Sequence, residues 1–345
     1  MQFLFFRRHT DFALFWTGML LVNIAVQIEA VTIGWQIYQI GRQTLSIRES
    51  AFLVGMVGLA QFIPMFLLTL YAGSVADRHS RRLIVLISLG IEILCVLGLV
   101  SVAHEVAPQV RHIFWIATAF GAARAFLSPA SSALVPMLVP KADMPQAISL
   151  KSLSWQAAVI VGPWIGGLLC AVSAATAYEV TAVLYLAGAA IILFMGANTT
   201  PIRQPGSQIA QIKEGLIYVW TNKIVFGAIS LDLFAVLLGG ATALLPAFAT
   251  DILNVGPEGF GLLRSGPAIG ALLMAAALSR WPLKRHAGRR MLLAVGAFGL
   301  ATVIFGLSKN IYLSVTALAV LGAADMISVY VRQTLVQIVT PDHMR

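Results

Sequence analysis

Long apolar runs alternate with short polar segments along almost the whole chain. Each run is close to or longer than the roughly 20 residues that a helix needs to cross a hydrocarbon core of about 30 Å. The expected spans are 12–40, 51–75, 82–104, 112–139, 143–171, 175–196, 223–250, 257–280, 289–308 and 311–339. This pattern predicts an all-α integral membrane protein with about ten spanning helices.

Composition supports lipid as the surrounding medium. The 345 residues are 59% hydrophobic and 11% charged, whereas soluble domains are about 45–50% apolar and about 25% charged. The sequence contains no nucleophile elbow, Walker loop, dinucleotide fingerprint or metal-binding cluster. We therefore expect neither an enzyme nor an ATP-driven pump, and no cofactor or metal.

The net charge of +9 raises the alternative of nucleic-acid binding, but the basic residues form short clusters between the apolar runs instead of one stripe. With the N-terminus placed inside, sixteen lysines and arginines fall on the cytoplasmic side and four on the outer side. Because Lys and Arg mark cytoplasmic loops, we expect a multi-pass protein of the inner, or plasma, membrane with a cytoplasmic N-terminus. The first helix lacks a cleavage pattern and is expected to stay in the mature chain.

An internal repeat divides the chain into two parts. Residues 50–82 align without a gap onto 258–290, and Gly121–Ala123 align onto Gly322–Ala324. Parallel halves related by an axis along the membrane normal are a known transporter plan. We expect a bundle of six helices over 1–196.

A polar connection follows that first bundle. Residues 197–222 are predicted to form a cytoplasmic linker with an amphipathic helix, and 223–345 a second bundle of four helices. Two helices of a twelve-helix plan are not accounted for. The chain is therefore expected to be truncated after its tenth helix.

The loop after the second expected span carries Gly73, Asp77, Arg78, Arg81 and Arg82. This spacing resembles the signature of the major facilitator superfamily, Gly-x-x-x-Asp-Arg-x-Gly-Arg-Arg, with serine replacing the second glycine. The resemblance implies two pseudo-symmetric bundles and a loop that latches one conformation and releases another. The glycine is expected to permit a close helix approach. The alternative is that the arginines only anchor the cytoplasmic face.

The fifth expected span carries Ala158, Gly162, Pro163, Gly166 and Gly167. It is similar to the antiporter signature Gly-x-x-x-Gly-Pro-x-x-Gly-Gly, with alanine at the first position, and this similarity implies export. Ordinary close packing between membrane helices is the alternative interpretation.

Several shorter stretches resemble the drug and siderophore efflux branch that includes the enterobactin exporters. They are Ser128–Ala130, Pro136–Pro140 and Glu214–Leu216. The resemblance implies a secondary active transporter of amphipathic small molecules, drug-like compounds or siderophores, coupled to protons. A proton-coupled nutrient importer of the same fold and a transport-inactive fragment or scaffold remain alternatives. The expected partners are the substrate, protons and the lipid bilayer, and the sequence indicates no oligomeric state.

Ionisable side chains inside a membrane span are functional candidates by default, because burying each one is costly. The candidate substrate and proton pathway consists of Glu29, Thr32, Gln36, Arg124, Asp232, Asp325 and Arg332. Glu29, Thr32 and Gln36 share one helix face, as do Asp325, Ser328 and Arg332, and both stripes are expected to line an aqueous cavity.

Arg124 and Asp325 occupy related positions in the repeat, which predicts an opposite-charge pair across the two bundles. Glu29, Asp232 and Asp325 are the candidate proton carriers. Structural pairing between helices is the alternative for each of them. Glu92 and Arg264 have no polar companion on their own helix face, so we interpret them as packing or interface charges.

Overall fold

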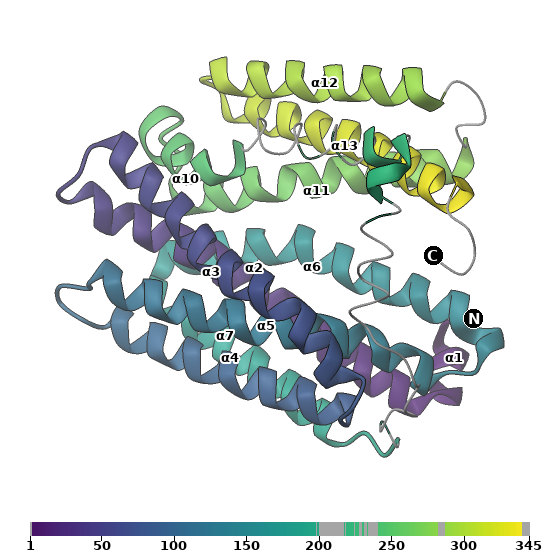
Figure 1. Ribbon diagram of the computed structural model, residues 1–345. Helices are drawn as coiled ribbons and strands as arrows, with labels where there is room; N and C mark the ends of the chain where they lie inside the picture. The colour runs from purple at the N-terminus through teal and green to yellow at the C-terminus, as the bar shows by residue number, and fades with distance from the viewer. Residues whose placement is uncertain are drawn as a thin grey trace. The chain divides into compact units, whose positions relative to one another are not determined.

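The computed structural model describes residues 2–197, 199, 217, 219–223, 225–227, 230, 233, 241–281 and 287–339 (Figure 1). Among these residues the regular elements are helices only, and nine helices are long and apolar enough to cross a membrane. The predicted all-α membrane fold is thus confirmed.

The first part of the chain forms a short N-terminal helix and six long ones. They are α1 Gln2–Arg8, α2 Thr10–Arg42, α3 Ile47–Ala76, α4 Arg81–Ala103, α5 Val110–Leu138, α6 Met144–Val172 and α7 Ala174–Leu193, with one 3-10 turn, η1 Lys141–Asp143. All six expected spans of this part fall on these long helices, with ends that differ by a few residues.

Among its described residues, the later part contains three further long helices. They are α11 Gly256–Arg280, α12 Ala287–Leu307 and α13 Ile311–Val339, preceded by the short turns η2 Ala241–Leu244, α10 Leu245–Ala247 and η3 Phe248–Ile252. The predicted span 223–250 and the predicted amphipathic helix of the linker lie mostly outside the described residues.

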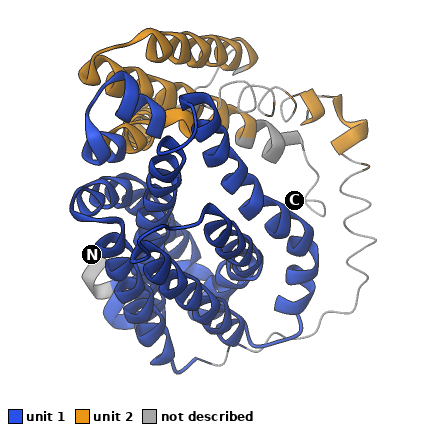
Figure 2. Ribbon diagram, turned by 90° about the vertical axis from the view of Figure 1, so that its left-hand side faces the viewer, with its two compact units in different colours: residues 1–204, 246–261 blue, residues 205–245, 262–345 orange. Residues whose placement is uncertain are grey.

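The chain divides into two compact units (Figure 2). The first consists of residues 1–204 and 246–261, and the second of residues 205–245 and 262–345. In the first unit α2 packs on α6 and α7, α3 on α5, and α4 on both α5 and α7. In the second unit α12 packs on α13.

Two helices of the first unit, α3 and α7, begin with polar side-chain caps. Ser46 precedes α3, and its hydroxyl accepts a hydrogen bond from the Glu49 amide while the Glu49 carboxylate accepts one from the Ser46 amide. Ser173 caps α7 by accepting from the Thr176 amide. These caps satisfy backbone donors that have no partner inside the helix.

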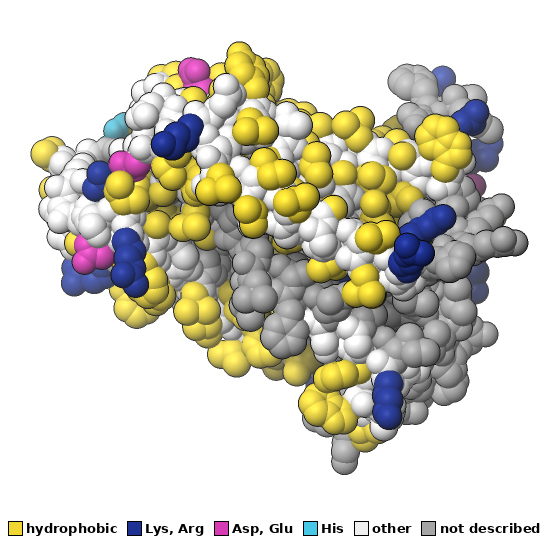
Figure 3. All heavy atoms as spheres, turned by 90° about the horizontal axis from the view of Figure 1, so that it is seen from above, with side chains coloured by type: hydrophobic (Ala, Val, Ile, Leu, Met, Phe, Trp, Pro, Cys, Tyr) yellow, Lys and Arg dark blue, Asp and Glu magenta, His cyan; other side chains and the backbone are white. Residues whose placement is uncertain are grey.

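The outward faces of the helices are apolar. Large side chains such as Phe52, Phe66 and Leu67 on α3 are more than 60% exposed. Figure 3 shows hydrophobic side chains across the middle of one face, with Lys and Arg toward its two ends. An apolar band bounded by basic residues is the surface that a bilayer requires.

Glycines set the closest helix crossings. A Cβ atom added to Gly121 on α5 would collide with the backbone oxygen of Gln61 on α3. In the second unit a Cβ on Gly322 of α13 would collide with the backbone oxygen of Pro267 on α11. Gly121 and Gly322 are partners in the sequence repeat, so the same close crossing recurs in both units.

Replacing Gly121 by alanine should therefore destabilise the first unit. We expect the Gly121→Ala variant to lose about 1–3 kcal/mol of unfolding free energy, because backbone atoms must separate to admit the methyl group. Gly90→Ala on α4 is the matched control, since a Cβ there meets no described atom within 4 Å. Denaturant titration of both variants in detergent checks this, and equal stability of the two would contradict the crossing.

Candidate functional site

A cluster of charged side chains lies inside the first unit. Glu29 of α2 accepts hydrogen bonds from the Arg124 guanidinium of α5 and the Tyr185 hydroxyl of α7, both at 2.9 Å. The Arg124 Nε atom lies 3.5 Å from a carboxylate oxygen of Glu92 on α4. Both glutamate side chains are 0% exposed, and Arg124 is 19% exposed. Four helices thus contribute to one buried ionic group, the Glu29–Arg124–Glu92 cluster.

The cluster contains more acid than base. With both glutamates ionised, two negative charges face a single guanidinium, and one proton would balance the group. One oxygen of Glu29 and both oxygens of Glu92 have no hydrogen-bond partner among the described residues. Burying an unbalanced charge is costly. The arrangement is therefore suited to taking up and releasing a proton.

The part played by Glu92 corrects the sequence interpretation. Its own helix face indeed offers no polar companion, but Arg124 approaches it from another helix. Periodicity along one helix cannot reveal such a partner. Tyr185 was not predicted either, because its partner Glu29 also lies on another helix.

Thr32 and Gln36, which share a face of α2 with Glu29, have surroundings that differ from the prediction. Thr32 is fully buried and accepts a contact from the Cys170 thiol on α6 at 3.4 Å. Gln36 accepts a hydrogen bond from the Tyr178 hydroxyl of α7 at 2.7 Å. Both side chains pack inside the helix bundle, so their expected place on the wall of an aqueous cavity is wrong.

The pathway residues of the second half are only partly described. Asp325 and Arg332 on α13 are half-buried, and Ser328 between them is buried. Asp232 lies outside the described residues. Because Asp325 and Arg124 belong to different units, their predicted pairing stays a prediction.

The arginines of the predicted gating loop bind the ends of neighbouring helices. Arg81 donates to the backbone oxygen of Ala133 near the end of α5 at 2.8 Å and lies 3.9 Å from Asp77. Arg82 donates to the backbone oxygen of Leu193, the last residue of α7. The contact of Arg82 is favourable because the last carbonyls of a helix lack partners within it and its C-terminal end attracts cations.

Two other residues of this loop are more exposed. Arg78 is exposed, and a Cβ atom added to Gly73 would meet no described atom within 4 Å. The close helix approach expected at Gly73 therefore stays a prediction.

The glycine-proline motif of α6 is buried and packs on two sides. A Cβ on Gly162 would lie 2.5 Å from Gln27, and one on Gly166 would lie 3.2 Å from the Ile28 backbone, both on α2. A Cβ on Gly167 would lie 2.5 Å from the backbone oxygen of Pro257. Pro163, also buried, makes the reciprocal close contact, through its backbone oxygen, with Gly261. The motif thus lets α6 approach two neighbours closely.

A further polar contact lies at the end of α2. Arg42 is 3.2 Å from a carboxylate oxygen of Asp251, and the Tyr38 hydroxyl donates to the other oxygen of the same carboxylate. Neither Tyr38 nor Asp251 was predicted from the sequence. The only available signal was the charge directly after the apolar run 223–250.

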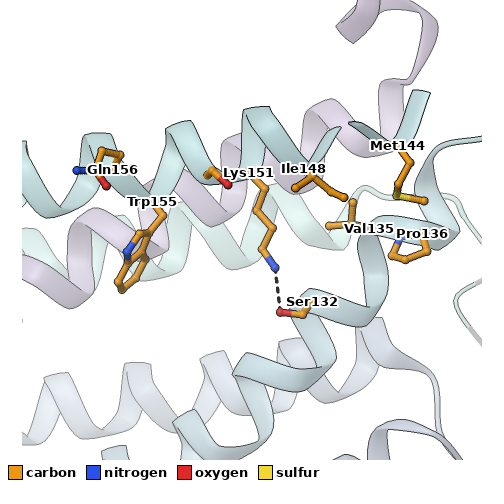
Figure 4. Close-up of a pocket in the computed structure, with 9 residues that line it drawn as sticks. Ser132, Val135, Pro136, Met144, Ile148, Lys151, Trp155 and Gln156 are labelled. Atoms are coloured by element: carbon orange, nitrogen blue, oxygen red, sulfur yellow. Dashed lines mark hydrogen bonds between the residues drawn. The ribbon is translucent and has the colours of Figure 1, made fainter. Parts of the chain in front are cut away.

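Two adjoining pockets open beside α5 and α6 in the first unit. The larger has a volume of about 490 Å³ and the other about 320 Å³, and both are lined by Ser132, Lys151 and Trp155. Figure 4 shows Lys151 reaching from α6 to Ser132 on α5, where its ammonium donates a hydrogen bond at 2.9 Å. Arg124 lines the smaller pocket and so connects it to the Glu29–Arg124–Glu92 cluster. Volumes of this size suit a small molecule.

Among the described residues, no group of three or more His, Cys, Asp and Glu side chains is placed to hold a metal ion. The polar contacts that the structure shows in this site are ion pairs and hydrogen bonds.

Removing the cation of the cluster should destabilise the protein. We expect Arg124→Met to lower the free energy of unfolding by about 3–5 kcal/mol, because two buried carboxylates lose their counter-charge. Arg111→Met is the matched control, since Arg111 is exposed at the start of the same helix. Adding Glu29→Gln and Glu92→Gln to Arg124→Met should recover much of the loss, and denaturant titration compares the variants. A loss no larger than that of Arg111→Met would contradict the account of the cluster.

Comparisons with known proteins assign the chain to a family. A family model described as transmembrane secretion effector matches residues 4–345. The enterobactin exporter EntS of Escherichia coli O1:K1 is 26% identical over 330 residues, which are 95% of this chain and 75% of that protein. The uncharacterised MFS-type transporter YjbB of Bacillus subtilis is 25% identical over 272 residues, and the match spans 65% of its length.

Solved transporters share the fold. The D-xylose–proton symporter superposes with a TM-score of 0.69 at 14% identity, covering 98% of this chain and 84% of that one. The nucleoside transporter NupG superposes with a TM-score of 0.69 at 15% identity, covering 95% and 84%. At these identities the likeness concerns the fold alone.

Proposed function

Because the chain belongs to the transmembrane secretion effector family of the major facilitator superfamily, we propose that it exports amphipathic small molecules, driven by protons. The relatives named as enterobactin exporters support export and make siderophores, beside drug-like compounds, candidate substrates. The glycine-proline motif of α6 resembles the antiporter signature and supports the same direction. Transport would proceed by alternating access, with two bundles rocking around a central site.

The observation that carries the proton part of the proposal is the Glu29–Arg124–Glu92 cluster. Two fully buried carboxylates share one guanidinium, so one proton changes the net charge of the group from negative to neutral. A change of charge in a low-dielectric interior alters the relative stability of conformations that differ in solvent access. Protonation on one side of the membrane and release on the other would then drive the transport cycle.

The orientation belongs to the same proposal. We place the N-terminus and the loop of Asp77, Arg78, Arg81 and Arg82 on the cytoplasmic side of the inner membrane, because basic residues gather there. In this orientation Arg81 and Arg82 donate hydrogen bonds to backbone oxygens in the cytoplasmic parts of α5 and α7. The pair of Arg42 and Asp251 then lies toward the outside.

Transport direction is tested in membrane vesicles with enterobactin as the labelled probe. Everted vesicles carrying the full chain should accumulate the probe when their interior is acidified, and a protonophore should abolish the accumulation. Accumulation only in right-side-out vesicles would identify an importer. No transport in either orientation, of enterobactin or of a panel of amphipathic dyes, would identify a transport-inactive scaffold.

Proton coupling is tested by neutralising the carboxylates. We expect Glu29→Gln and Glu92→Gln each to abolish accumulation driven by the pH gradient while preserving exchange of labelled for unlabelled probe, which needs no net proton movement. Glu105→Gln is the matched control, since Glu105 is exposed in the α4–α5 connection. Full gradient-driven transport by both cluster variants would remove these residues as proton carriers.

A further inference from the structure

Lys151 lies well inside a membrane-spanning helix. It is seven residues beyond the first residue of α6, about two helical turns. Among the described residues no carboxylate pairs with it, and its one hydrogen bond goes to the neutral hydroxyl of Ser132. An ammonium group has three donor hydrogens. Two of them therefore remain for a ligand, and an ammonium without a paired carboxylate favours a ligand that is negative.

The charges around the two pockets have the same sign. Arg124 and Lys151 are the charged side chains that line them. Glu29 and Glu92, which balance Arg124, are fully buried behind it and line neither pocket. A ligand in these pockets meets cations while the carboxylates stay hidden.

Aromatic side chains lie next to these cations. Trp155 follows Lys151 by one helical turn, lines both pockets and is 49% exposed. Trp16 of α2 lines the smaller pocket, and its indole N–H donates to the backbone oxygen of Leu150 at 2.8 Å, which fixes the position of the ring. Flat apolar faces beside a cation suit a planar ring that carries an anionic group.

We propose that Lys151 and Trp155 form the binding site for an organic anion with an aromatic ring, and that such anions are the transported class. The anionic group would accept hydrogen bonds from the Lys151 ammonium and the Ser132 hydroxyl, and the ring would pack on Trp155. This inference rests on the proposed transport function. It agrees with export, because an anion moves outward down the potential of a cell whose interior is negative.

The phosphate of an anionic lipid could also supply the negative charge that binds Lys151. The choice of lipids in the bilayer distinguishes such a lipid from a free organic anion. Binding is measured to the full chain in nanodiscs of phosphatidylcholine alone, which contain no lipid with net negative charge. Three probes share one ring and differ in charge: 1-naphthoate, the neutral 1-naphthylmethanol and the cation 1-naphthylmethylammonium. Partition into empty nanodiscs is subtracted.

We expect 1-naphthoate to bind most tightly of the three. Lys151→Met should weaken its binding at least about tenfold, as for the loss of a charged hydrogen bond, and Lys151→Arg should retain most of it. Trp155→Ala should weaken all three probes, because they share the ring. Lys141→Met is the matched control, since Lys141 is exposed at the start of η1 and should leave every affinity unchanged.

Four results would overturn the proposal. The first three are tighter binding of the cation than of 1-naphthoate, equal binding by Lys151→Met and the original chain, and no specific binding of any probe at millimolar concentration. An effect of Lys151→Met that arises only after phosphatidylglycerol is added would assign Lys151 to lipid and equally overturn it. Equilibrium binding does not require transport, so the two experiments are independent. A negative result in the binding measurement would not contradict export, and a negative result in the vesicle measurement would not contradict anion binding at Lys151.

Discussion

Charge balance inside a lipid-facing bundle is the constraint on which the rest of the first unit depends. Arg124 cannot lose its proton at any ordinary pH, so its position on α5 requires negative charge nearby. Glu29 and Glu92 supply it from α2 and α4, and Tyr185 of α7 completes the hydrogen bonding. The same interaction that links four helices places two carboxylates beside a single guanidinium in the interior of the first unit.

Close helix crossings bring these charges within reach of one another. Gly18 of α2 and Gly188 of α7 face each other so closely that a Cβ atom on either would meet the other's backbone oxygen within 3 Å. Gly162 and Gly166 likewise bring α6 against α2. Small residues at such crossings are the usual means of packing helices in lipid. In this protein they also set the distance between α2, which carries Glu29, and the helices that carry Tyr185 and Lys151.

Hydrophobic runs predicted the membrane fold well, because a spanning helix needs length and apolarity and both are visible along one chain. The arginines of the loop after α3 were likewise visible as a spaced motif, and the structure shows what Arg81 and Arg82 bind. No described atom lies within 4 Å of a Cβ placed on Gly73, so the tight approach expected there stays a prediction.

Partners on different helices could not be predicted in this way. Periodicity places Glu29, Thr32 and Gln36 on one face but does not say what that face meets, and α6 and α7 cover Thr32 and Gln36. Glu92 was taken for a packing charge because Arg124 is 32 positions away on another helix. Lys151 was counted among the basic residues of the cytoplasmic side, and only its place between Ser132 and Trp155 connects it to a pocket. The sequence does not give the rotation of each helix about its axis, and this rotation determines which helix each face contacts.

The central claim is that the Glu29–Arg124–Glu92 cluster holds one exchangeable proton. Infrared difference spectroscopy of the full chain in nanodiscs, recorded between acidic and alkaline buffer, detects a protonated carboxyl group directly by its C=O stretch. The account predicts such a band in the original chain and its loss when both Glu29 and Glu92 are replaced by glutamine. A band that persists undiminished in that double variant, or its absence from the original chain at every pH, would contradict the account.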